Sequence, residues 1–211
     1  MLVRTIETTV HGRYLLDERG DDLLIGFHGY GESAESHLAE LQRIPEIDSW
    51  SLAAVQALHP FYVRSSGQVV ANWMTSQDRE LAIADNIAYV RRVIDALPRR
   101  GRLALLGFSQ GAQMAVRAAA YAAHADGLIL LGGDIPPEIH AEESVRLPPT
   151  LLARGLHDEW MTVEKFTKDL NFVERRAAVV THVFDGGHEW TEEFRTAAGE
   201  FLRGLKRSHV A

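Results

Sequence analysis

The stretch that decides the fold runs from residue 103 to residue 112 and reads Leu103-Ala104-Leu105-Leu106-Gly107-Phe108-Ser109-Gln110-Gly111-Ala112. Its first four residues predict a buried strand, and an alanine-rich helical stretch begins at Ala112. Between them, Gly107 to Gly111 match G-x-S-x-G, a motif that requires a strand before it and a helix after it. The two glycines permit a sharp turn that leaves the Ser109 hydroxyl projecting above the sheet. We therefore predict that Ser109 is a nucleophile.

Ser109 has one alternative, structural role, in which it caps the N-terminus of the helix from a glycine-rich turn. A phosphate-binding loop is excluded because no Gly-Lys-Ser/Thr sequence follows. The helix N-terminus behind Ser109 would stabilise developing negative charge, which favours the nucleophile over the cap.

The rest of the chain alternates short apolar runs with longer helical stretches. Further buried strands are expected over residues 23–27, 51–57, 128–131, 150–153 and 177–184, and helices over 78–97, 112–123, 162–173 and 191–205. Continuous apolar strands that alternate with helices predict an α/β fold with a mostly parallel central sheet flanked by helices. Residues 2–16 alternate around Gly12 and predict an N-terminal antiparallel pair. Because no repeat or linker divides the chain, we predict a single domain over residues 1–211.

A serine nucleophile needs a base, and the base needs a carboxylate that fixes its tautomer. His188 is the predicted base because it follows the last strand in a loop that contains Gly186 and Gly187. A helix-capping or merely exposed histidine is the alternative for His188. His182 lies inside the preceding strand and is expected to be a satisfied surface or core histidine.

Asp158 is the predicted acid, because it follows the strand over residues 150–153 after four intervening residues. Adjacent parallel strands would place its loop beside the loop of His188. Asp134, which follows the preceding strand, stays open as an alternative acid. Asp158 could also cap the helix near Thr162, and Asp185 is interpreted as a turn residue.

A tetrahedral intermediate needs two positioned hydrogen-bond donors. The backbone N–H of Gln110, directly after the nucleophile, is the first predicted donor. The second is expected from the loop after the strand over residues 23–27, where Gly29 and Gly31 flank Tyr30. We predict the backbone N–H of Tyr30 as this donor, and a plain glycine turn with a core histidine at His28 is the alternative.

Five segments of the chain resemble, in order and spacing, the small serine carboxylesterase/phospholipase family of α/β hydrolases, which includes the acyl-protein thioesterase-like enzymes: His28-Gly29-Tyr30-Gly31-Glu32, Gly107-Phe108-Ser109-Gln110-Gly111-Ala112, Leu131-Gly132-Gly133, Gly155-Leu156-His157-Asp158 and Gly187-His188. The resemblance spans nearly the whole chain. It implies an α/β-hydrolase fold without a large cap domain, and Ser109, Asp158 and His188 as the triad. It also implies metal-independent hydrolysis of carboxylic esters or thioesters, so neither a cofactor nor a metal is expected.

The sequence departs from the family in two places, and both put the substrate in question. Ala71-Asn72-Trp73-Met74-Thr75 stands where the family usually has an aromatic-acidic segment, and Glu159-Trp160-Met161-Thr162 replaces a frequent Val-Pro pair. We expect five side chains near these departures to line the substrate pocket, with core packing as the equal alternative: Trp73, Met74, Trp160, Met161 and Trp190.

Composition limits the partners of the chain. Its 211 residues carry 22 basic and 29 acidic side chains, a net charge of −7, which argues against nucleic-acid binding. The basic cluster of Arg203, Lys206 and Arg207 is interpreted as a solvated last helical turn. Without cysteine, thiolate catalysis, thiolate metal sites and disulfides are excluded. We expect no membrane span, no signal peptide and a cytoplasmic location. A homodimer stays open as an alternative to a monomer.

These observations predict a serine hydrolase that cleaves carboxylic esters of short to medium acyl chains through an acyl-enzyme intermediate. Two alternatives are kept. The first is a thioesterase or lysophospholipase with the same triad. The second, from another class, is a noncatalytic binding protein with a hydrolase fold, which would usually have lost one triad residue.

Overall fold

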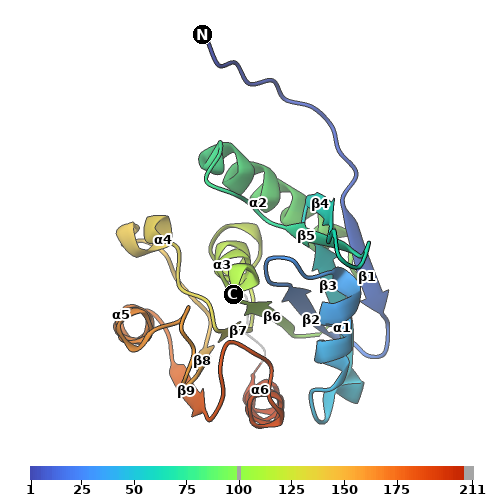
Figure 1. Cartoon of the computed structure of the whole chain (residues 1–211). Coiled ribbons are helices and arrows are strands. Elements are labelled where there is room, and N and C mark those ends of the chain that lie inside the picture. Colours follow the sequence, from blue (N-terminus) through green and yellow to red (C-terminus); the bar gives the residue numbers. More distant parts are fainter. Residues whose placement is uncertain (99–100, 207–211) are drawn as a thin grey trace.

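A seven-stranded sheet forms the centre of the computed structural model, which describes residues 1–98 and 101–206 (Figure 1). Its strands are arranged in the order β1-β3-β2-β6-β7-β8-β9. Their bounds are Arg13–Asp17 for β1, Asp22–Phe27 for β2, Trp50–Gln56 for β3, Leu103–Phe108 for β6, Gly127–Leu131 for β7, Thr150–Gly155 for β8 and Val179–Phe184 for β9. All neighbouring pairs are parallel except β1 and β3. The mostly parallel sheet expected from the sequence is therefore confirmed.

Helices cover both faces of the sheet, because neighbouring residues of each strand point to opposite sides. Leu23 and Ile25 of β2 belong to the core cluster under α2, α3 and α5, whereas Leu24 belongs to the cluster under α1 and α6. This two-sided burial explains why the strands read as continuous apolar runs. The helices are α1 (Ala34–Gln42), α2 (Arg79–Ala96), α3 (Gln110–Arg117), α4 (Pro137–Ala141), α5 (Val163–Glu174) and α6 (Glu192–Gly204), with short turns at Ile47–Ser49 and Ala118–Ala122.

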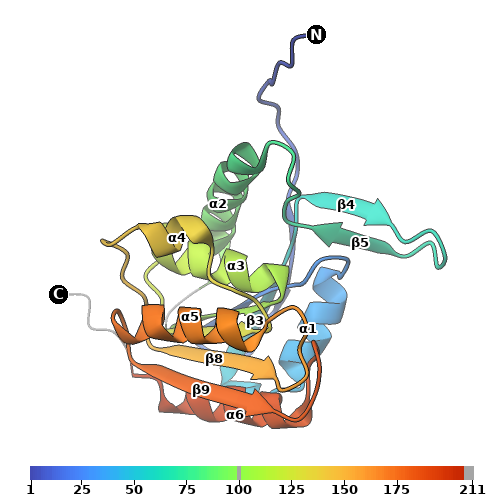
Figure 2. The ribbon, with the colours of Figure 1, turned by 60° about the vertical axis from the view of Figure 1, so that its left-hand side comes forward.

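The N-terminal antiparallel pair expected from the sequence is confirmed in part, since the structure has one antiparallel edge strand in place of two paired ones. Only β1 is a strand, and it pairs antiparallel with β3 rather than with residues 2–11. Residues 1–12 form no strand and extend away from the sheet (Figures 1 and 2). Their alternating apolar residues, among them Leu2 and Ile6, are exposed, because no neighbouring surface buries one side of the segment.

Several elements lay outside the prediction. The hairpin of β4 (His59–Tyr62) and β5 (Val69–Asn72) projects from the sheet (Figure 2), and α1 and α4 are helices that the sequence pattern did not indicate. Arg203 of the predicted basic cluster lies in α6 and pairs with Glu46 at 2.7 Å. Arg207 of that cluster lies outside the described residues. No helix in the described part of the chain combines the length and the apolar character that crossing a membrane requires.

Candidate active site

Ser109 occupies the sharp turn between β6 and α3. Its φ of 55° lies in the left-handed region, which is unusual for a residue with a side chain. A Cβ atom at Gly107 would lie 2.2 Å from the Gly111 carbonyl oxygen, so the crossing of strand and helix requires glycine there. The Ser109 N–H donates to the Leu131 carbonyl at 2.8 Å. Because the Ser109 side chain makes no capping hydrogen bond, the helix-cap alternative is wrong.

The Ser109 hydroxyl faces His188, and His188 faces Asp158. Ser109 Oγ lies 2.8 Å from His188 Nε2, and His188 Nδ1 lies 2.9 Å from Asp158 Oδ2. The Asp158 side chain is only 1% exposed. Its other oxygen, Oδ1, accepts the backbone N–H groups of Trp160 and Met161, both at 2.8 Å. The carboxylate is thus held on both oxygens, with one of them directed at the imidazole.

The loops that carry Asp158 and His188 lie side by side, as the sequence predicts. They follow β8 and β9, which are parallel neighbours. The pairing continues beyond the strands, since the Leu156 N–H donates to Phe184 O at 2.8 Å and the His157 N–H donates to Gly186 O at 2.9 Å. These backbone hydrogen bonds fix one loop against the other.

The imidazole of His188 is also held by its neighbours. Its ring centroid lies 4.9 Å from the Phe108 ring and 6.4 Å from the Trp160 ring. A Cβ atom at Gly132, which has a φ of 61°, would lie 3.1 Å from the His188 ring. A side chain at residue 132 would therefore push against the imidazole.

The alternative acid and the turn aspartate have other partners. Asp134 Oδ1 accepts from Gln113 Nε2 at 2.8 Å. Asp185 is exposed and lies 3.3 Å from His157 Nε2. Neither carboxylate hydrogen-bonds to His188 in the described part of the chain. Among residues 1–98 and 101–206, no group of three or more His, Asp and Glu side chains is arranged to hold a metal ion.

His182 lies in β9, away from Ser109, and its ring stacks on Phe184 with centroids 6.0 Å apart. The expectation of a satisfied histidine is wrong. Its Nε2 atom is buried and has no hydrogen-bond partner among the described residues.

His28 fastens the start of the loop after β2. Its Nδ1 lies 2.7 Å from the Gly29 carbonyl, and its Nε2 accepts the Ala57 N–H at 3.0 Å. The His28 carbonyl accepts from Trp73 Nε1 at 2.8 Å. Burial lowers the pKa of His28, so the ring is neutral at neutral pH. His28 is a buried core histidine, which agrees with that part of the plain-turn alternative.

The same loop holds its backbone N–H groups in different ways. The Gly29 N–H donates to Glu32 Oε2 at 2.7 Å, and the Gly31 N–H donates to the Ala71 carbonyl at 3.0 Å. In the described residues, no hydrogen bond uses the N–H of Tyr30. A Cβ atom at Gly29 would lie 3.3 Å from Ser109 Cβ, so the loop lies directly against the nucleophile turn.

Glu32 is a residue that the sequence reasoning missed. Burial raises the pKa of its carboxyl, and the hydrogen bond from Gly29 opposes that rise. The charge of Glu40 adds to the rise of the Glu32 pKa, and the charge of His188 opposes it. The signal was an acidic residue that directly follows the His28–Gly31 turn.

Gln110 connects the nucleophile turn to the segment after β5. Its Oε1 accepts the Trp73 N–H at 2.9 Å, and its Nε2 donates to the Met74 carbonyl at 2.8 Å. The side chain is therefore occupied in bracing the turn, which leaves the backbone N–H as the group of Gln110 that can serve an oxyanion.

The five expected pocket residues divide into core and surface. Trp73, Met74 and Met161 are buried within the core cluster under α2, α3 and α5, which favours their packing alternative. Trp190 is half-buried and packs against the cluster on the α1 and α6 side. Trp160 is 72% exposed beside His188, so it is the member placed to meet a substrate.

Two aromatic side chains near the site were not predicted. The exposed ring of Tyr30 lies 5.7 Å from the ring of Phe61 in β4. Glu32 forms a bridge with Ala71 of β5, which joins the loop after β2 to the hairpin. The packing of this hairpin against Tyr30 depends on contacts distant in sequence, so no local pattern indicated it.

The sheet order and the turn at Ser109 define the class of protein as an α/β hydrolase. A family model described as phospholipase/carboxylesterase matches residues 17–205. The chain therefore belongs to the phospholipase/carboxylesterase family, and it is a carboxylesterase/phospholipase-like hydrolase. Among the curated proteins, none gives a significant match to this sequence.

Solved structures with similar folds include esterases and a thioesterase. The structure of esterase PE8 is 24% identical with a TM-score of 0.72, covering 93% of this chain and 100% of that one. Zea mays acyl-protein thioesterase 2 is 17% identical with a TM-score of 0.71, covering 92% and 98%. The Bacillus cereus carboxylesterase is 15% identical with a TM-score of 0.69, covering 91% and 93%. At these identities the likeness shows the α/β-hydrolase fold.

Proposed function

We propose that this chain is a serine esterase that hydrolyses carboxylic esters of short to medium acyl chains through Ser109, His188 and Asp158. The observation that carries the proposal is the continuous line of contacts from Ser109 Oγ through His188 to Asp158, at 2.8 and 2.9 Å. Residues 1–211 would act as one catalytic domain. Family membership supports the reaction class and leaves the substrate to be inferred from the site.

Acylation follows from these contacts. His188 Nε2 takes the hydroxyl proton as Ser109 Oγ attacks the ester carbonyl carbon, and Asp158 stabilises the imidazolium that forms. The backbone N–H groups of Tyr30 and Gln110 donate hydrogen bonds to the carbonyl oxygen and stabilise the negative charge that develops on it. The tetrahedral intermediate collapses when the bond to the alcohol oxygen breaks, and His188 returns its proton to that oxygen. The acyl group remains on Ser109.

Deacylation repeats the sequence with water in place of serine. His188 removes a proton from a water molecule, whose oxygen attacks the acyl carbon. The bond between that carbon and Ser109 Oγ then breaks, and the serine oxygen recovers the proton from His188. The products are one carboxylic acid and one alcohol, so atoms and protons balance over both halves.

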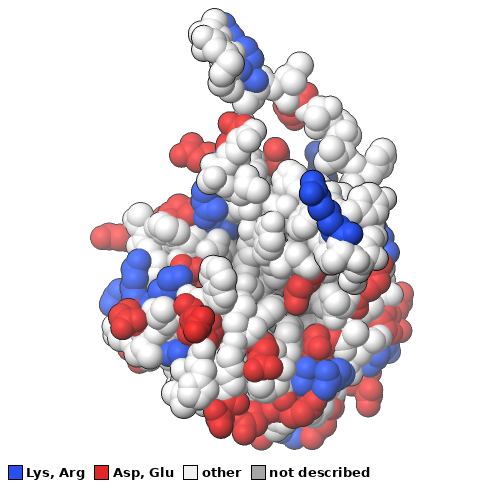
Figure 3. All heavy atoms as spheres, viewed as in Figure 1, with Lys and Arg blue, Asp and Glu red and all other residues white. Residues whose placement is uncertain are grey.

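The surroundings of Ser109 support an uncharged, modest acyl group. Trp73, Met74 and Met161 fill the core next to the site, so an acyl chain would rest on exposed side chains such as Trp160 and Tyr30. Figure 3 shows a strip of uncharged surface down the middle of the face that carries the loop between β9 and α6, with acidic and basic side chains around it. Such a surface suits a neutral ester better than a polyanion.

Covalent labelling tests the proposal. A fluorophosphonate should modify Ser109 stoichiometrically, because its tetrahedral phosphorus resembles the intermediate that the two N–H groups would hold. Ser109→Ala should remove both the label and the turnover of a chromogenic ester while the fold is retained. Labelling of a different serine would overturn the nucleophile, and absence of ester turnover by the unlabelled wild type would favour the noncatalytic binding protein.

Thioester hydrolysis is the second candidate, favoured by the structural likeness to Zea mays acyl-protein thioesterase 2. The same triad would serve both reactions. Oxygen esters and thioesters with matched acyl chains of increasing length separate the two candidates. A higher kcat/KM for the thioester at every length would replace the esterase assignment.

A further inference from the structure

Trp73 directly follows β5 and contacts both parts of the chain that carry the proposed oxyanion donors. Its side chain is fully buried and packs on the rings of Phe27 and His28, with ring centroids 5.7 and 5.4 Å away. Packing alone would explain an apolar side chain at this position. Trp73 has three hydrogen-bonding groups, however, and each is paired with a different part of the fold. These partners point to a role beyond core packing.

The indole of Trp73 holds the loop after β2. Its Nε1–H donates to the carbonyl of the buried His28 at 2.8 Å. The N–H of Tyr30, one of the two proposed oxyanion donors, comes two residues later. The loop is tied to β5 again directly after Tyr30, because the Gly31 N–H donates to the Ala71 carbonyl at 3.0 Å. Tyr30 therefore lies between two points that the segment from Ala71 to Trp73 fixes.

The backbone of the same segment holds the nucleophile turn. The Trp73 N–H donates to Gln110 Oε1 at 2.9 Å, and the Met74 carbonyl accepts from Gln110 Nε2 at 2.8 Å. The backbone N–H of Gln110 is the other proposed oxyanion donor. Trp73 therefore contacts both halves of the proposed oxyanion hole, one through its side chain and the other through its backbone.

A buried polar side chain of α2 fixes Trp73 in turn. Asn86 Nδ2 donates to the carbonyls of Trp73 and Ala82, both at 2.7 Å. Asn86 is fully buried, and its Oδ1 has no hydrogen-bond partner among the described residues. A buried amide with an unpaired oxygen costs stability. This cost indicates that the amide fixes the position of Trp73 and does not serve core packing alone.

We propose that Trp73 is a positioning residue, which holds the loop after β2 and the turn of Gln110 at a fixed separation, so that the N–H groups of Tyr30 and Gln110 donate to the same oxyanion. The proposal rests on the proposed serine hydrolase mechanism. Positioned donors stabilise the charge that develops in the transition state more than they stabilise the neutral ester. A loosened separation should therefore lower kcat more than it raises KM.

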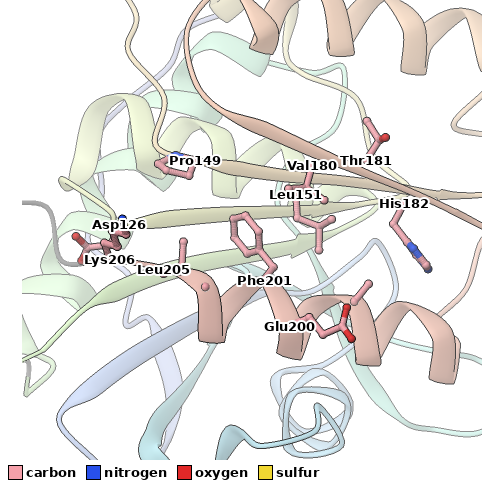
Figure 4. A pocket seen from close by; sticks show the side chains of 12 residues that line it. Asp126, Pro149, Leu151, Val180, Thr181, His182, Glu200, Phe201, Leu205 and Lys206 are labelled. Carbon is pink, nitrogen blue, oxygen red and sulfur yellow. The ribbon is translucent and has the colours of Figure 1, made fainter.

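The groove between β8, β9 and α6 lies outside this arrangement. It has a volume of about 680 Å³ and is lined in part by Leu151, Val180 and Phe201 (Figure 4). Its lining residues include none of the proposed triad and neither Trp73 nor Gln110. A substitution in this groove therefore serves as a control for changes in the core around Ser109.

Trp73→Phe tests the proposal. It keeps an aromatic ring in the core and the backbone contact with Gln110, and it deletes the hydrogen bond to the His28 carbonyl. Since the loss of one oxyanion donor costs about 10²–10³-fold in kcat, a donor that is only displaced should cost about tenfold, with KM changed by less than about twofold. Steady-state kinetics on one chromogenic ester provides the measurement.

Trp50→Phe is the matched control, because Trp50 is also buried but belongs to the core cluster under α1 and α6. Urea denaturation should show a similar loss of stability in the two variants, whereas only Trp73→Phe should lose kcat. Phe201→Leu, in the groove, should also leave kcat unchanged. Equal losses of kcat in Trp73→Phe and in either control would overturn the proposal.

Amide hydrogen exchange provides a measurement that needs no activity. In Trp73→Phe, the hydrogen-bonded N–H groups of Gly29 and Gly31 should exchange at least about tenfold faster than in the wild type, and Trp50→Phe should leave them unchanged. Unchanged exchange together with unchanged kcat in Trp73→Phe would overturn the proposal. Faster exchange in Trp73→Phe, combined with a wild type that turns over no ester, would support the hold of Trp73 on the loop and refute the proposed hydrolase function.

Gln110→Met tests the other end of the segment and serves if Trp73→Phe does not fold. It retains the backbone N–H but loses both hydrogen bonds to residues 73 and 74, so kcat should again fall about tenfold. Gln113→Met is its control, since Gln113 lies in the same helix and hydrogen-bonds to Asp134 instead. The same kcat in both methionine variants would refute the hold of the segment on the turn.

Discussion

Loops meet at Ser109 from two sides, and the two sides are held in opposite ways. On one side, the loops after β8 and β9 carry Asp158 and His188, and an acidic side chain fixed on both oxygens sets the direction of the imidazole. On the other side, the loop after β2 is held by the buried His28 and the half-buried Glu32, whose side chains hydrogen-bond to backbone atoms. The first arrangement directs a carboxyl oxygen at a ring nitrogen, whereas the second depends on groups for which burial disfavours the charge.

The two sides control different features: one the orientation of the His188 imidazole, the other the position of the loop that contains Tyr30. In the proposed triad, Asp158 would determine which nitrogen of His188 carries the proton. Glu32 determines where the loop that contains Tyr30 lies relative to the nucleophile turn. Changes on the two sides should therefore differ in size and in the quantity that they alter.

The largest effect is expected at Asp158, in the loop after β8. Asp158→Asn keeps an oxygen for the N–H groups of Trp160 and Met161 but favours the wrong tautomer of His188. The kcat should fall by about 10⁴-fold, as for the equivalent change in a serine-protease triad. Steady-state kinetics on one chromogenic ester provides the measurement. Asp134→Asn is the matched control and should cost less than about tenfold; the reverse ranking would make Asp134 the acid.

A smaller effect is expected when the clamp on the other side is removed. Glu32→Ala deletes the acceptor of the Gly29 N–H, so the Tyr30 N–H loses its position. Since one oxyanion donor contributes about 10²–10³-fold in kcat, a displaced donor should cost at most about 10²-fold, with little change in KM. Glu32→Gln retains an acceptor oxygen and should keep most of the activity. Equal losses in the Ala and Gln variants would show that the charge, rather than the clamp, is what matters.

Acid should destabilise the β2 and α1 side in a predictable direction. Burial lowers the pKa of His37 to about 3 and also lowers the pKa of His28, so the unfolded chain binds more protons than the folded one as the pH falls below 6.5. From neutral pH to pH 5, His37 alone should cost about 2 kcal/mol of unfolding free energy. Urea denaturation at both pH values provides the test.

His37→Leu is the control for this acid effect. Both ring nitrogens of His37 are buried without a partner among the described residues, so leucine removes two unsatisfied polar atoms along with the titration. The variant should lose less stability between neutral pH and pH 5 than the wild type. An unchanged pH dependence would place the acid sensitivity elsewhere.

The smallest effect is expected at Trp160, on the surface beside His188. Trp160 is largely exposed, and the hydrogen bond to Asp158 uses its backbone N–H, so Trp160→Ala leaves the carboxylate in place. We expect a KM for longer acyl esters that rises by less than about tenfold, since one lost apolar contact contributes about 1 kcal/mol. A fall in kcat with unchanged KM would instead show that the indole positions His188.

The parts of the molecule that depend on the local residue pattern could be predicted from the sequence. The strand, the turn and the helix around Ser109 follow from an apolar run, two glycines and an alanine-rich stretch. The proximity of the loops of Asp158 and His188 follows from the adjacency of parallel strands. Both are consequences of order along the chain.

The features that the sequence pattern missed depend on which other parts of the folded chain a residue contacts. Residues 2–11 alternate like a strand, yet no second surface meets them. Trp73 and Met161 look like pocket residues beside a motif, yet the core closes over them. Glu32 acts through a backbone N–H three residues earlier, a contact that becomes visible only when the loop is folded.

The order of strands has a consequence for how the protein should lose activity. Ser109 follows β6, the fourth of seven strands, whereas His188 follows β9 at the edge. Edge strands unfold locally at a lower free energy than central strands. Ser109 and His188 therefore lie in regions that differ in local stability. Warming should therefore inactivate the enzyme through local opening at β9 before the ellipticity of the whole chain declines.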